Sequence, residues 1–196
     1  MVGKIVIVGG GAAGVSAALW ARKVDRKVEI VVVNRENYPE YSRCGLPYVI
    51  SRVISDPNNL IEHSSSWYSK FLRIELKLGR VVVDGDPDKK ILEIKNLRNG
   101  KVEKEQYDKL VIATGSSPSV PPIPGVDKNG VFTLKTIEDA VKIREAAEKS
   151  KNAVIVGAGM IGLEVAEALH SLGLKITVVE LLPQILPTVL DADFAR

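Results

Sequence analysis

Short apolar runs alternate with amphipathic segments along this chain, and the pattern predicts an α/β fold. The apolar runs are rich in valine and isoleucine, as is typical of strands buried in a parallel sheet; they cover residues 4–8, 28–33, 109–113, 152–156 and 175–179. Residues 15–24 favour a helix after the first run, and a second helix follows the fourth run as far as residue 172. The order of strand, helix and strand predicts two parallel β-α-β units.

The pattern changes between these two units. Residues 41–54 and 66–72 favour helices, whereas residues 74–107 alternate between polar and apolar positions. Turn signals at Asp84-Gly85-Asp86-Pro87 and Asn99-Gly100 interrupt the alternation, which predicts an antiparallel meander. Residues 136–149 predict another helix, with Thr136 as its N-cap and Asp139 at the third helical position.

A proline-rich stretch divides the chain. Residues 116–124 hold four of the ten prolines, and such a segment is extended and stiff, as in an interdomain linker. We therefore expect two domains, over residues 1–118 and 119–196. The predicted fold class is α/β, with two Rossmann-like dinucleotide-binding units and the antiparallel meander inserted in the first.

The strand–glycine turn–helix–strand unit is written twice, over residues 4–34 and 152–180. Each copy carries a GxGxxG pattern between its first strand and its helix: Gly9, Gly11 and Gly14, then Gly157, Gly159 and Gly162. The first glycine makes a tight turn, the second lets the backbone approach a pyrophosphate, and the third lets helix and strand pack closely. The repeat therefore predicts two dinucleotide sites, with phosphates at the helix N-termini.

The residue that ends the second strand of each unit bears on nucleotide choice. Glu180 ends the second unit, where a carboxylate accepts hydrogen bonds from the adenosine ribose and repels a 2′-phosphate. Leu181 and Leu182 follow and offer no cation for that phosphate, so we expect NADH in preference to NADPH. The first unit has Asn34 at this position, and either Asn34 or Glu36 is a candidate for the ribose.

Composition narrows the class of protein. The 27 basic and 24 acidic residues nearly cancel, unlike the basic excess of a nucleic-acid-binding protein. No apolar stretch reaches the ~18 residues that span a bilayer, and no cleavage-type site follows the apolar start, so we expect a cytoplasmic protein. One cysteine excludes an intrachain disulfide, and the two histidines and the cysteine lack metal-ligand spacing.

These motifs in this order resemble the FAD-dependent pyridine nucleotide–disulfide oxidoreductases. The strand ending in Ala113-Thr114-Gly115 is similar to that family's ATG motif, where the chain leaves the FAD domain and crosses to the NAD domain. The resemblance covers the whole chain. It implies that the first glycine turn binds FAD and the second binds NADH.

The single cysteine is similar to that of one branch of this family, which contains coenzyme A-disulfide reductases, persulfide or polysulfide reductases, NADH oxidases and NADH peroxidases. The string Cys44-Gly45-Leu46-Pro47-Tyr48 looks most like coenzyme A-disulfide reductase. Peroxidases and water-forming oxidases carry a histidine in the first glycine turn, where this chain has Ala12. The resemblance therefore argues against a dedicated peroxidase.

Cys44 is the expected catalytic residue. A position at the start of a helix and beside Arg43 favours its thiolate. The resemblance implies a cycle from NADH through FAD to a mixed disulfide between Cys44 and coenzyme A, with release of the thiol. The alternative is that Cys44 is a small buried apolar residue without redox chemistry.

The resemblance also implies a set of binding residues. For FAD these are Gly9, Gly11, Ala12, Ala13, Gly14, Asn34, Arg35, Ser42, Arg43, Val82, Ala113, Thr114 and Gly115. For NADH they are Gly157, Gly159, Ile161, Gly162, Glu164 and Glu180, and Met160 occupies the position where several relatives place an aromatic residue that shields the flavin. Lys23 and Lys70 are expected near the phosphates of coenzyme A, and the alternative is that both are ordinary surface charges. For Met160 the alternative is packing within the loop, and for Glu164 it is a role on the helix surface.

Family members run on for about as many residues again, so we expect this chain to be an N-terminal part of a longer enzyme, homodimeric at full length. The expected acceptor is a small-molecule disulfide or persulfide, with coenzyme A as a candidate. The alternatives are an NADH oxidase that reduces oxygen, a ferredoxin or rubredoxin reductase, and a nucleotide-binding fragment without turnover. No nucleic acid, membrane or metal partner is expected.

Overall fold

The computed structural model describes residues 3–187 and 189–195. Contacts between Cα atoms divide the chain into two compact units. The first holds residues up to Ser42 together with Ile61–Ser116, and the second holds Arg43–Leu60 together with the residues from Ser117 onward. Each unit is described by itself.

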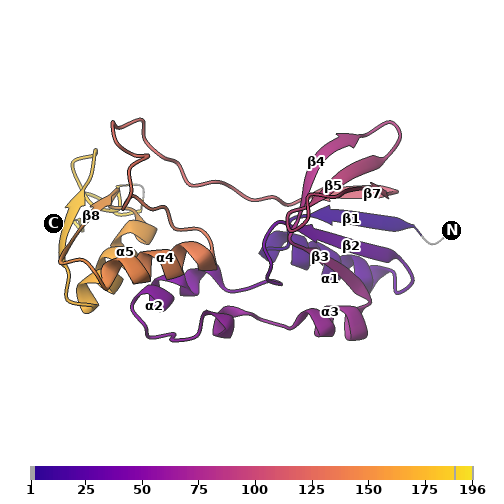
Figure 1. The fold of residues 1–196 in the computed structure, drawn as a ribbon, viewed down its shortest axis with the longest axis horizontal. Helices are drawn as coiled ribbons and strands as arrows, with labels where there is room; N and C mark the ends of the chain where they lie inside the picture. Colours follow the sequence, from indigo (N-terminus) through magenta and orange to yellow (C-terminus); the bar gives the residue numbers. More distant parts are fainter. Residues whose placement is uncertain (1–2, 188, 196) are drawn as a thin grey trace. The chain divides into compact units, whose positions relative to one another are not determined.

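A four-stranded parallel sheet forms the centre of the first unit, in the order β3-β2-β1-β7. Its strands are β1 (Lys4–Val8), β2 (Glu29–Asn34), β3 (Ile74–Leu78) and β7 (Lys109–Ile112). The parallel register pairs Val8 with Val33 and Val8 with Ile112, which aligns the carboxyl ends of the three strands. In Figure 1, helices α1 (Ala12–Val24) and α3 (Ser65–Leu72) lie on one side of this sheet.

Alternate residues of the central strands fill two cores, because successive side chains of a strand point to opposite faces. On the helical face, Ile7, Ile30 and Val32 are fully buried against Val15 of α1 and Tyr68 of α3. On the other face, Val6, Val31 and Val33 pack against Leu92 and Ile94. This burial on both sides explains why the strands are continuous apolar runs.

The second face is covered by an antiparallel sheet of β4 (Arg80–Asp86), β5 (Ile91–Asn96) and β6 (Val102–Gln106). The prediction of a meander is therefore correct over 80–106 and wrong for its first part. Residues 74–78 form β3, which pairs in parallel with β2 and buries Ile74 on the helical face. The pairing partner of this segment lies more than forty residues earlier, so local alternation did not reveal it.

A network of charged side chains joins the parallel sheet to the meander. The carboxylate of Glu105 in β6 is almost fully buried, and its oxygens lie 2.5 Å from Lys4 Nζ and 2.6 Å from Lys77 Nζ. Lys4 also pairs with Glu29, and Lys77 with Glu103. Burial opposes the ionisation of Glu105, but the hydrogen bonds from both lysines outweigh it and hold the pKa of this carboxyl below its usual value.

We expect Glu105→Gln to lower the free energy of unfolding of the protein by about 2 kcal/mol at neutral pH. This loss is smaller than the loss for an isolated buried ion pair, because Lys4 still pairs with Glu29 and Lys77 still pairs with Glu103. The folded-state pKa is depressed, so this stability is present above the ordinary glutamate pKa and is lost as the pH falls through the folded value. Urea unfolding at neutral and acidic pH measures both effects. Glu93→Gln, which breaks an exposed pair with Lys104 on the same meander, is the matched control and should change stability by less than about 0.5 kcal/mol. Equal losses in both variants would contradict the prediction.

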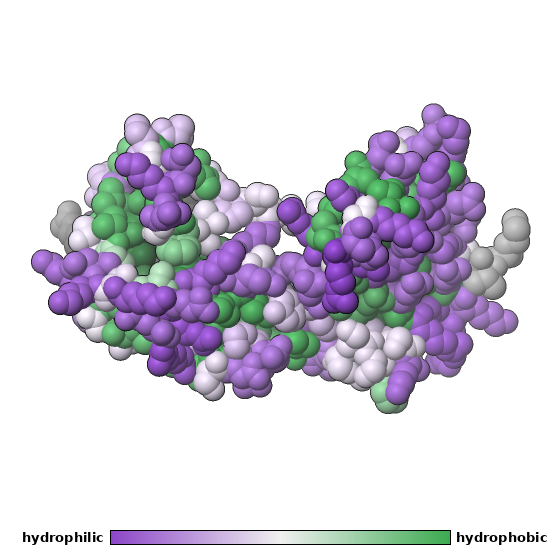
Figure 2. All heavy atoms as spheres, in the orientation of Figure 1, coloured by the Kyte–Doolittle hydropathy of each residue, from purple (hydrophilic) through white to green (hydrophobic). Residues whose placement is uncertain are grey.

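The second unit contains the second β-α-β element. Strands β8 (Asn152–Val156) and β9 (Lys175–Val179) pair in parallel, and α5 (Met160–Ser171) connects them. Helix α4 (Ile137–Ala147) precedes this element and begins at Thr136, which forms the expected capping box with Asp139. Several apolar side chains of this unit are exposed, namely Val154, Val156, Val179 and Leu181. Figure 2 shows that each unit has apolar surface among its charged side chains.

The helix predicted over 41–54 is much shorter than expected. The structure has a 3-10 turn at Arg43–Gly45 (η1), the five-residue helix α2 (Leu46–Ile50), and a second 3-10 turn at Pro57–Leu60 (η2). Pro47 stands in the first turn of α2, where proline is tolerated, and the backbone at Arg52 is left-handed (φ 66°), which ends the helix. Helix α2 packs against α4 and α5. No helix in the described ranges has both the length and the apolar character that a bilayer crossing requires.

Candidate functional site

The first glycine turn connects β1 to α1, and two of its three motif glycines have no room for a side chain. Gly9 has φ +117°, and a Cβ there would lie 2.1 Å from the carbonyl oxygen of Ala113. A Cβ at Gly14 would lie 1.9 Å from the carbonyl oxygen of Gly9. Gly11 differs, because nothing lies within 4 Å of a Cβ built there. Packing within the protein explains Gly9 and Gly14, whereas the open side of Gly11 is where a phosphate would approach the backbone.

The second glycine turn, between β8 and α5, repeats this geometry. Gly157 has φ +102°, and a Cβ at Gly162 would lie 2.2 Å from the carbonyl oxygen of Gly157. A Cβ at Gly159 would again meet nothing within 4 Å. Both turns therefore have a first glycine with positive φ, an open second glycine and a close-packed third glycine, whereas only the first turn also packs closely at its first glycine, Gly9.

The N-termini of α1 and α5, which follow the two glycine turns, differ from the N-termini of α3 and α4. The N-cap residues of α1 and α5 are Gly11 and Gly159, so neither helix has a capping side chain, and neither has an acidic residue in its first turn. By contrast, α3 is capped by Ser64, and α4 is capped by Thr136 and carries Glu138 and Asp139 in its first turn. Free N–H groups and the positive end of the helix dipole suit an anion, so α1 and α5 fit a pyrophosphate and α4 does not.

In both units a side chain at the carboxyl end of the second strand accepts a hydrogen bond from the backbone of the glycine turn; Asn34 is the last residue of β2, and Glu180 directly follows β9. Asn34 is 7% exposed; its Oδ1 accepts from Gly10 N at 3.3 Å, and its Nδ2 donates to the carbonyl oxygen of Tyr38 at 2.9 Å. Glu180 accepts from Leu182 N at 2.9 Å and from Ala158 N at 2.7 Å, and these backbone bonds lower the pKa of Glu180. Both residues thus stand beside their turns with polar oxygens, as a ribose partner would.

Glu36, the other candidate for the first ribose, lies two residues beyond the end of β2. Its Oε2 accepts a hydrogen bond from the Tyr41 hydroxyl at 2.5 Å. Asn34 and Glu36 are therefore both engaged by neighbouring groups, and the ribose assignment stays a prediction.

Cys44 lies in the 3-10 turn η1, and it is exposed. This exposure is at odds with the alternative in which Cys44 is a buried apolar residue. The next residue, Gly45, leaves room for the buried Leu60, because a Cβ at Gly45 would lie 2.2 Å from Leu60 Cδ2. Arg43 does not extend freely into solvent: its NH1 donates to the carbonyl oxygen of Lys135 at 2.8 Å. The helix that follows Cys44 is shorter than predicted, because α2 has only five residues.

The remaining candidate residues fall into three groups. Beside the first turn, Ala12 and Ala13 are exposed in the first turn of α1, and Arg35 and Ser42 are exposed. Ala113 donates its N–H to Val8 O at 2.8 Å, Thr114 is exposed, Gly115 has φ +72°, and Val82 is half-buried in β4. Along α5, Met160, Ile161 and Glu164 are exposed.

Lys23 lies on α1 and Lys70 lies on α3, and hydrogen bonds from Arg22 join these two helices within the first unit. Arg22 Nε donates to Leu72 O at 2.7 Å, and Arg22 NH2 donates to Arg73 O at 2.9 Å. Lys23 Nζ stands 4.3 Å from the ring centroid of Trp20, whose side chain is 61% exposed. Sequence reasoning missed Trp20; its spacing of three residues from Lys23 on one helix is the signal that could have found it.

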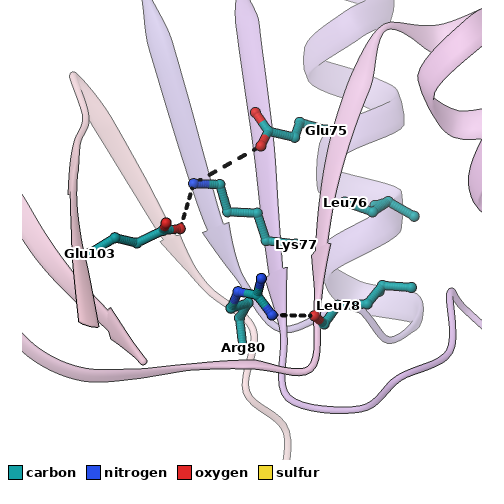
Figure 3. Close-up of a pocket in the computed structure, with 6 residues that line it drawn as sticks. All are labelled: Glu75, Leu76, Lys77, Leu78, Arg80 and Glu103. Atoms are coloured by element: carbon teal, nitrogen blue, oxygen red, sulfur yellow. Dashed lines mark hydrogen bonds and ion pairs between the residues drawn. The ribbon is translucent and has the colours of Figure 1, made fainter. Parts of the chain in front are cut away.

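A groove of about 460 Å³ lies beside β3 in the first unit, and Figure 3 shows its lining residues. Lys77 within it pairs with Glu103 at 2.9 Å, and Arg80 NH1 donates to Leu78 O at 3.3 Å. Its cationic groups are thus engaged by the protein itself, and none of the predicted site residues lines it. Within the described ranges, no group of three histidine, cysteine or acidic residues is arranged to hold a metal ion.

Two glycine turns built for pyrophosphates, on parallel β-α-β units, define a class of protein that binds two dinucleotides. The profile described as pyridine nucleotide-disulphide oxidoreductase matches residues 3–196. The chain therefore belongs to that family. FAD and NADH are the expected cofactors of such a protein, and the residues around both turns fit them.

Individual relatives cover nearly all of this chain. It is 39% identical over 195 residues to an NADH oxidase of Methanocaldococcus jannaschii. The aligned residues make up 98% of this chain and 43% of that protein. It is 37% identical to an NAD(P)H coenzyme A polysulfide/persulfide reductase of Pyrococcus horikoshii, over 90% of this chain and 39% of that protein. The crystal structure of reduced Bacillus anthracis CoADR-RHD superposes with a TM-score of 0.95 at 33% identity, over 100% of this chain and 35% of that one. The chain spans less than half the length of these relatives.

Proposed function

We propose that this chain forms the cofactor-binding and redox part of an FAD-dependent NADH oxidoreductase that reduces coenzyme A disulfide, or a related disulfide or persulfide, at Cys44. The observation that carries the proposal is the exposure of the only cysteine, in a turn of the sequence Cys-Gly-Leu-Pro-Tyr, within a chain that has two pyrophosphate cradles. An exposed thiol can meet a substrate disulfide, whereas a buried one is inert.

The chemistry assigned to Cys44 is thiol–disulfide exchange. The Cys44 thiolate attacks one sulfur of the substrate disulfide, the substrate S–S bond breaks, and the first thiolate leaves. Cys44 is then joined to the other half of the substrate in a mixed disulfide. Bound FAD would pass on the two electrons that NADH supplies. Two-electron reduction of the mixed disulfide, with uptake of one proton, would then release the second thiol and restore the Cys44 thiolate.

The preference for NADH is assigned to Glu180. Its carboxylate is held beside the second turn by the N–H groups of Leu182 and Ala158, and the same hydrogen bonds keep it ionised. A fixed negative charge at the end of the second strand suits two ribose hydroxyls and repels a 2′-phosphate. Exchange of NADH for NADPH should therefore raise KM, and equal KM values would contradict this assignment.

Coenzyme A carries phosphates and an adenine base, and the exposed face of α1 and α3 offers groups for both. Lys23 and Lys70 are exposed ammonium groups, and Trp20 presents an exposed ring beside Lys23. Phosphates bind lysine, and an aromatic ring stacks on a base. We assign these side chains to the nucleotide end of the disulfide substrate.

The identity of the electron acceptor distinguishes the proposed disulfide reductase from the alternative, an NADH oxidase. The name of the Methanocaldococcus relative favours a second candidate function, NADH oxidase, in which oxygen accepts the electrons. We expect the FAD-loaded holoenzyme to oxidise NADH without oxygen when coenzyme A disulfide is added, and to release two thiols per NADH. Absorbance of NADH and a thiol assay measure both. Turnover with oxygen alone, and none with coenzyme A disulfide or polysulfide, would establish the oxidase and overturn the proposal.

A further inference from the structure

The segment that carries Cys44 is held by α4, far along the chain, in the second unit. We call Arg43–Leu60 the cysteine segment. Three polar contacts join it to α4 and to residues that flank this helix. Arg43 donates to Lys135 O at 2.8 Å, Arg144 donates to Ser55 O at 3.2 Å, and Arg52 forms an ion pair with Glu148, the C-cap residue of α4. The Arg43 tie is part-buried, and the other two are exposed.

The acceptor of the Arg43 bond is itself held in place. Asp139 Oδ2 accepts from Lys135 N at 3.0 Å and from Thr136 N at 2.9 Å, and Thr136 Oγ1 accepts from Asp139 N at 3.2 Å. These three bonds fix the backbone on both sides of the Lys135 carbonyl. The carbonyl is therefore presented to the guanidinium of Arg43 by a rigid helix start rather than by a free loop.

The two sides of Cys44 are held by different means. After it, Leu46, Val49 and Ile50 of α2 are buried, so packing against α4 and α5 holds the chain. Before it, Ser42 is exposed, and Arg43 is the neighbouring residue with a hydrogen bond to a distant element. A hydrogen bond from a charged donor is roughly twice as strong as a neutral one, so the bond to the Lys135 carbonyl helps to hold the turn on its upstream side.

We propose that Arg43, anchored through the Lys135 carbonyl by Asp139, is a positioning residue that sets the orientation of the Cys44 turn. The proposal rests on the proposed function of Cys44. Exchange between a thiolate and a disulfide needs the attacking sulfur in line with the S–S bond, and a displacement of about 1 Å can cost roughly a hundredfold in rate. Arg43 thus acts on the reaction by fixing the backbone beside the nucleophile.

The first test uses the fact that Cys44 is the only cysteine, so a nitroxide spin label attached through a disulfide reports on this turn alone. We expect Arg43→Ala and Asp139→Ala to increase the mobility of the label in the electron paramagnetic resonance spectrum, and Arg43→Lys to restore part of the wild-type line shape. Glu148→Gln and Arg144→Ala are the matched controls, because they cut the other two ties of the same segment. They should leave the line shape unchanged.

The second test is kinetic and uses the FAD-loaded holoenzyme with coenzyme A disulfide. Arg43→Ala and Asp139→Ala should lower kcat, expressed per bound flavin, roughly tenfold with unchanged KM for NADH, whereas both controls should keep kcat within about twofold of wild type. Equal changes in all four variants, or a decrease in kcat that follows the melting temperature alone, would overturn the proposal. If the label responds to Arg43 and Asp139 as expected but the wild type reduces no disulfide, the positioning role stands and the proposed function fails.

Discussion

Replacing Cys44 with serine is expected to lower kcat for disulfide reduction by at least a factor of about a thousand. Serine is close to cysteine in size, and the exposed position has no packing to lose, so the fold should be retained. A hydroxyl, however, neither ionises near neutral pH nor forms an S–S bond, and the mixed disulfide cannot arise. The measurement is steady-state NADH oxidation with coenzyme A disulfide in the absence of oxygen.

The controls separate a chemical effect from a structural one. The variant should keep the flavin spectrum of the wild type and should still accept electrons from NADH, because neither glycine turn is altered. Val53→Ser changes another exposed residue of the cysteine segment and should leave disulfide reduction unchanged. Undiminished disulfide reduction in the Cys44→Ser protein would contradict the mechanism and would favour a ferredoxin- or rubredoxin-reductase function, which needs no cysteine.

The elements that sequence alone predicted well are those whose pattern is local. β1, α1 and β2 follow from one apolar run, one glycine turn and one amphipathic segment, and the same holds for β8, α5 and β9. The Thr136 cap is also a local signal, and the structure confirms it. Each of these features depends on residues within about four positions of one another.

The two wrong element predictions have a different origin. β3 was assigned to the meander because its alternation is the same in a parallel and an antiparallel sheet; only its pairing with β2 distinguishes the two. The helix over 41–54 was predicted from apolar spacing, which takes no account of the position of Pro47 in a first turn or of the left-handed backbone at Arg52.

Side-chain partners at the site could be predicted least. The close packing at Gly14 and Gly162 follows the motif, and so does the open space at Gly11 and Gly159, because the motif itself states these roles. The acceptor of Arg43 lies 92 residues away in the sequence, and the partner of Lys4 in the meander is equally remote. Such contacts are fixed by the packing of whole elements, so no spacing rule reveals them.

Gly14→Ala is expected to destabilise the protein by more than about 3 kcal/mol and to abolish retention of FAD. The added Cβ would lie 1.9 Å from the carbonyl oxygen of Gly9 and 3.3 Å from Ile7 Cγ2. The first of these atoms belongs to the backbone of the turn, so α1 must move away from β1, and the cradle between them opens. Urea unfolding and the flavin absorbance that remains after gel filtration measure the two effects.

Gly11→Ala is the matched comparison, because it adds the same methyl group to the same turn where nothing lies within 4 Å. Its cost in folding should stay below about 1 kcal/mol, the usual difference between glycine and alanine at an N-cap. FAD retention should nevertheless fall, since the methyl group occupies the space through which a pyrophosphate reaches the backbone. A Gly11→Ala protein that keeps FAD as the wild type does would contradict the assignment of this turn as the FAD cradle. A Gly14→Ala protein with wild-type stability would contradict the packing argument. The pair therefore tests separately what the fold requires of this turn and what the cofactor requires of it.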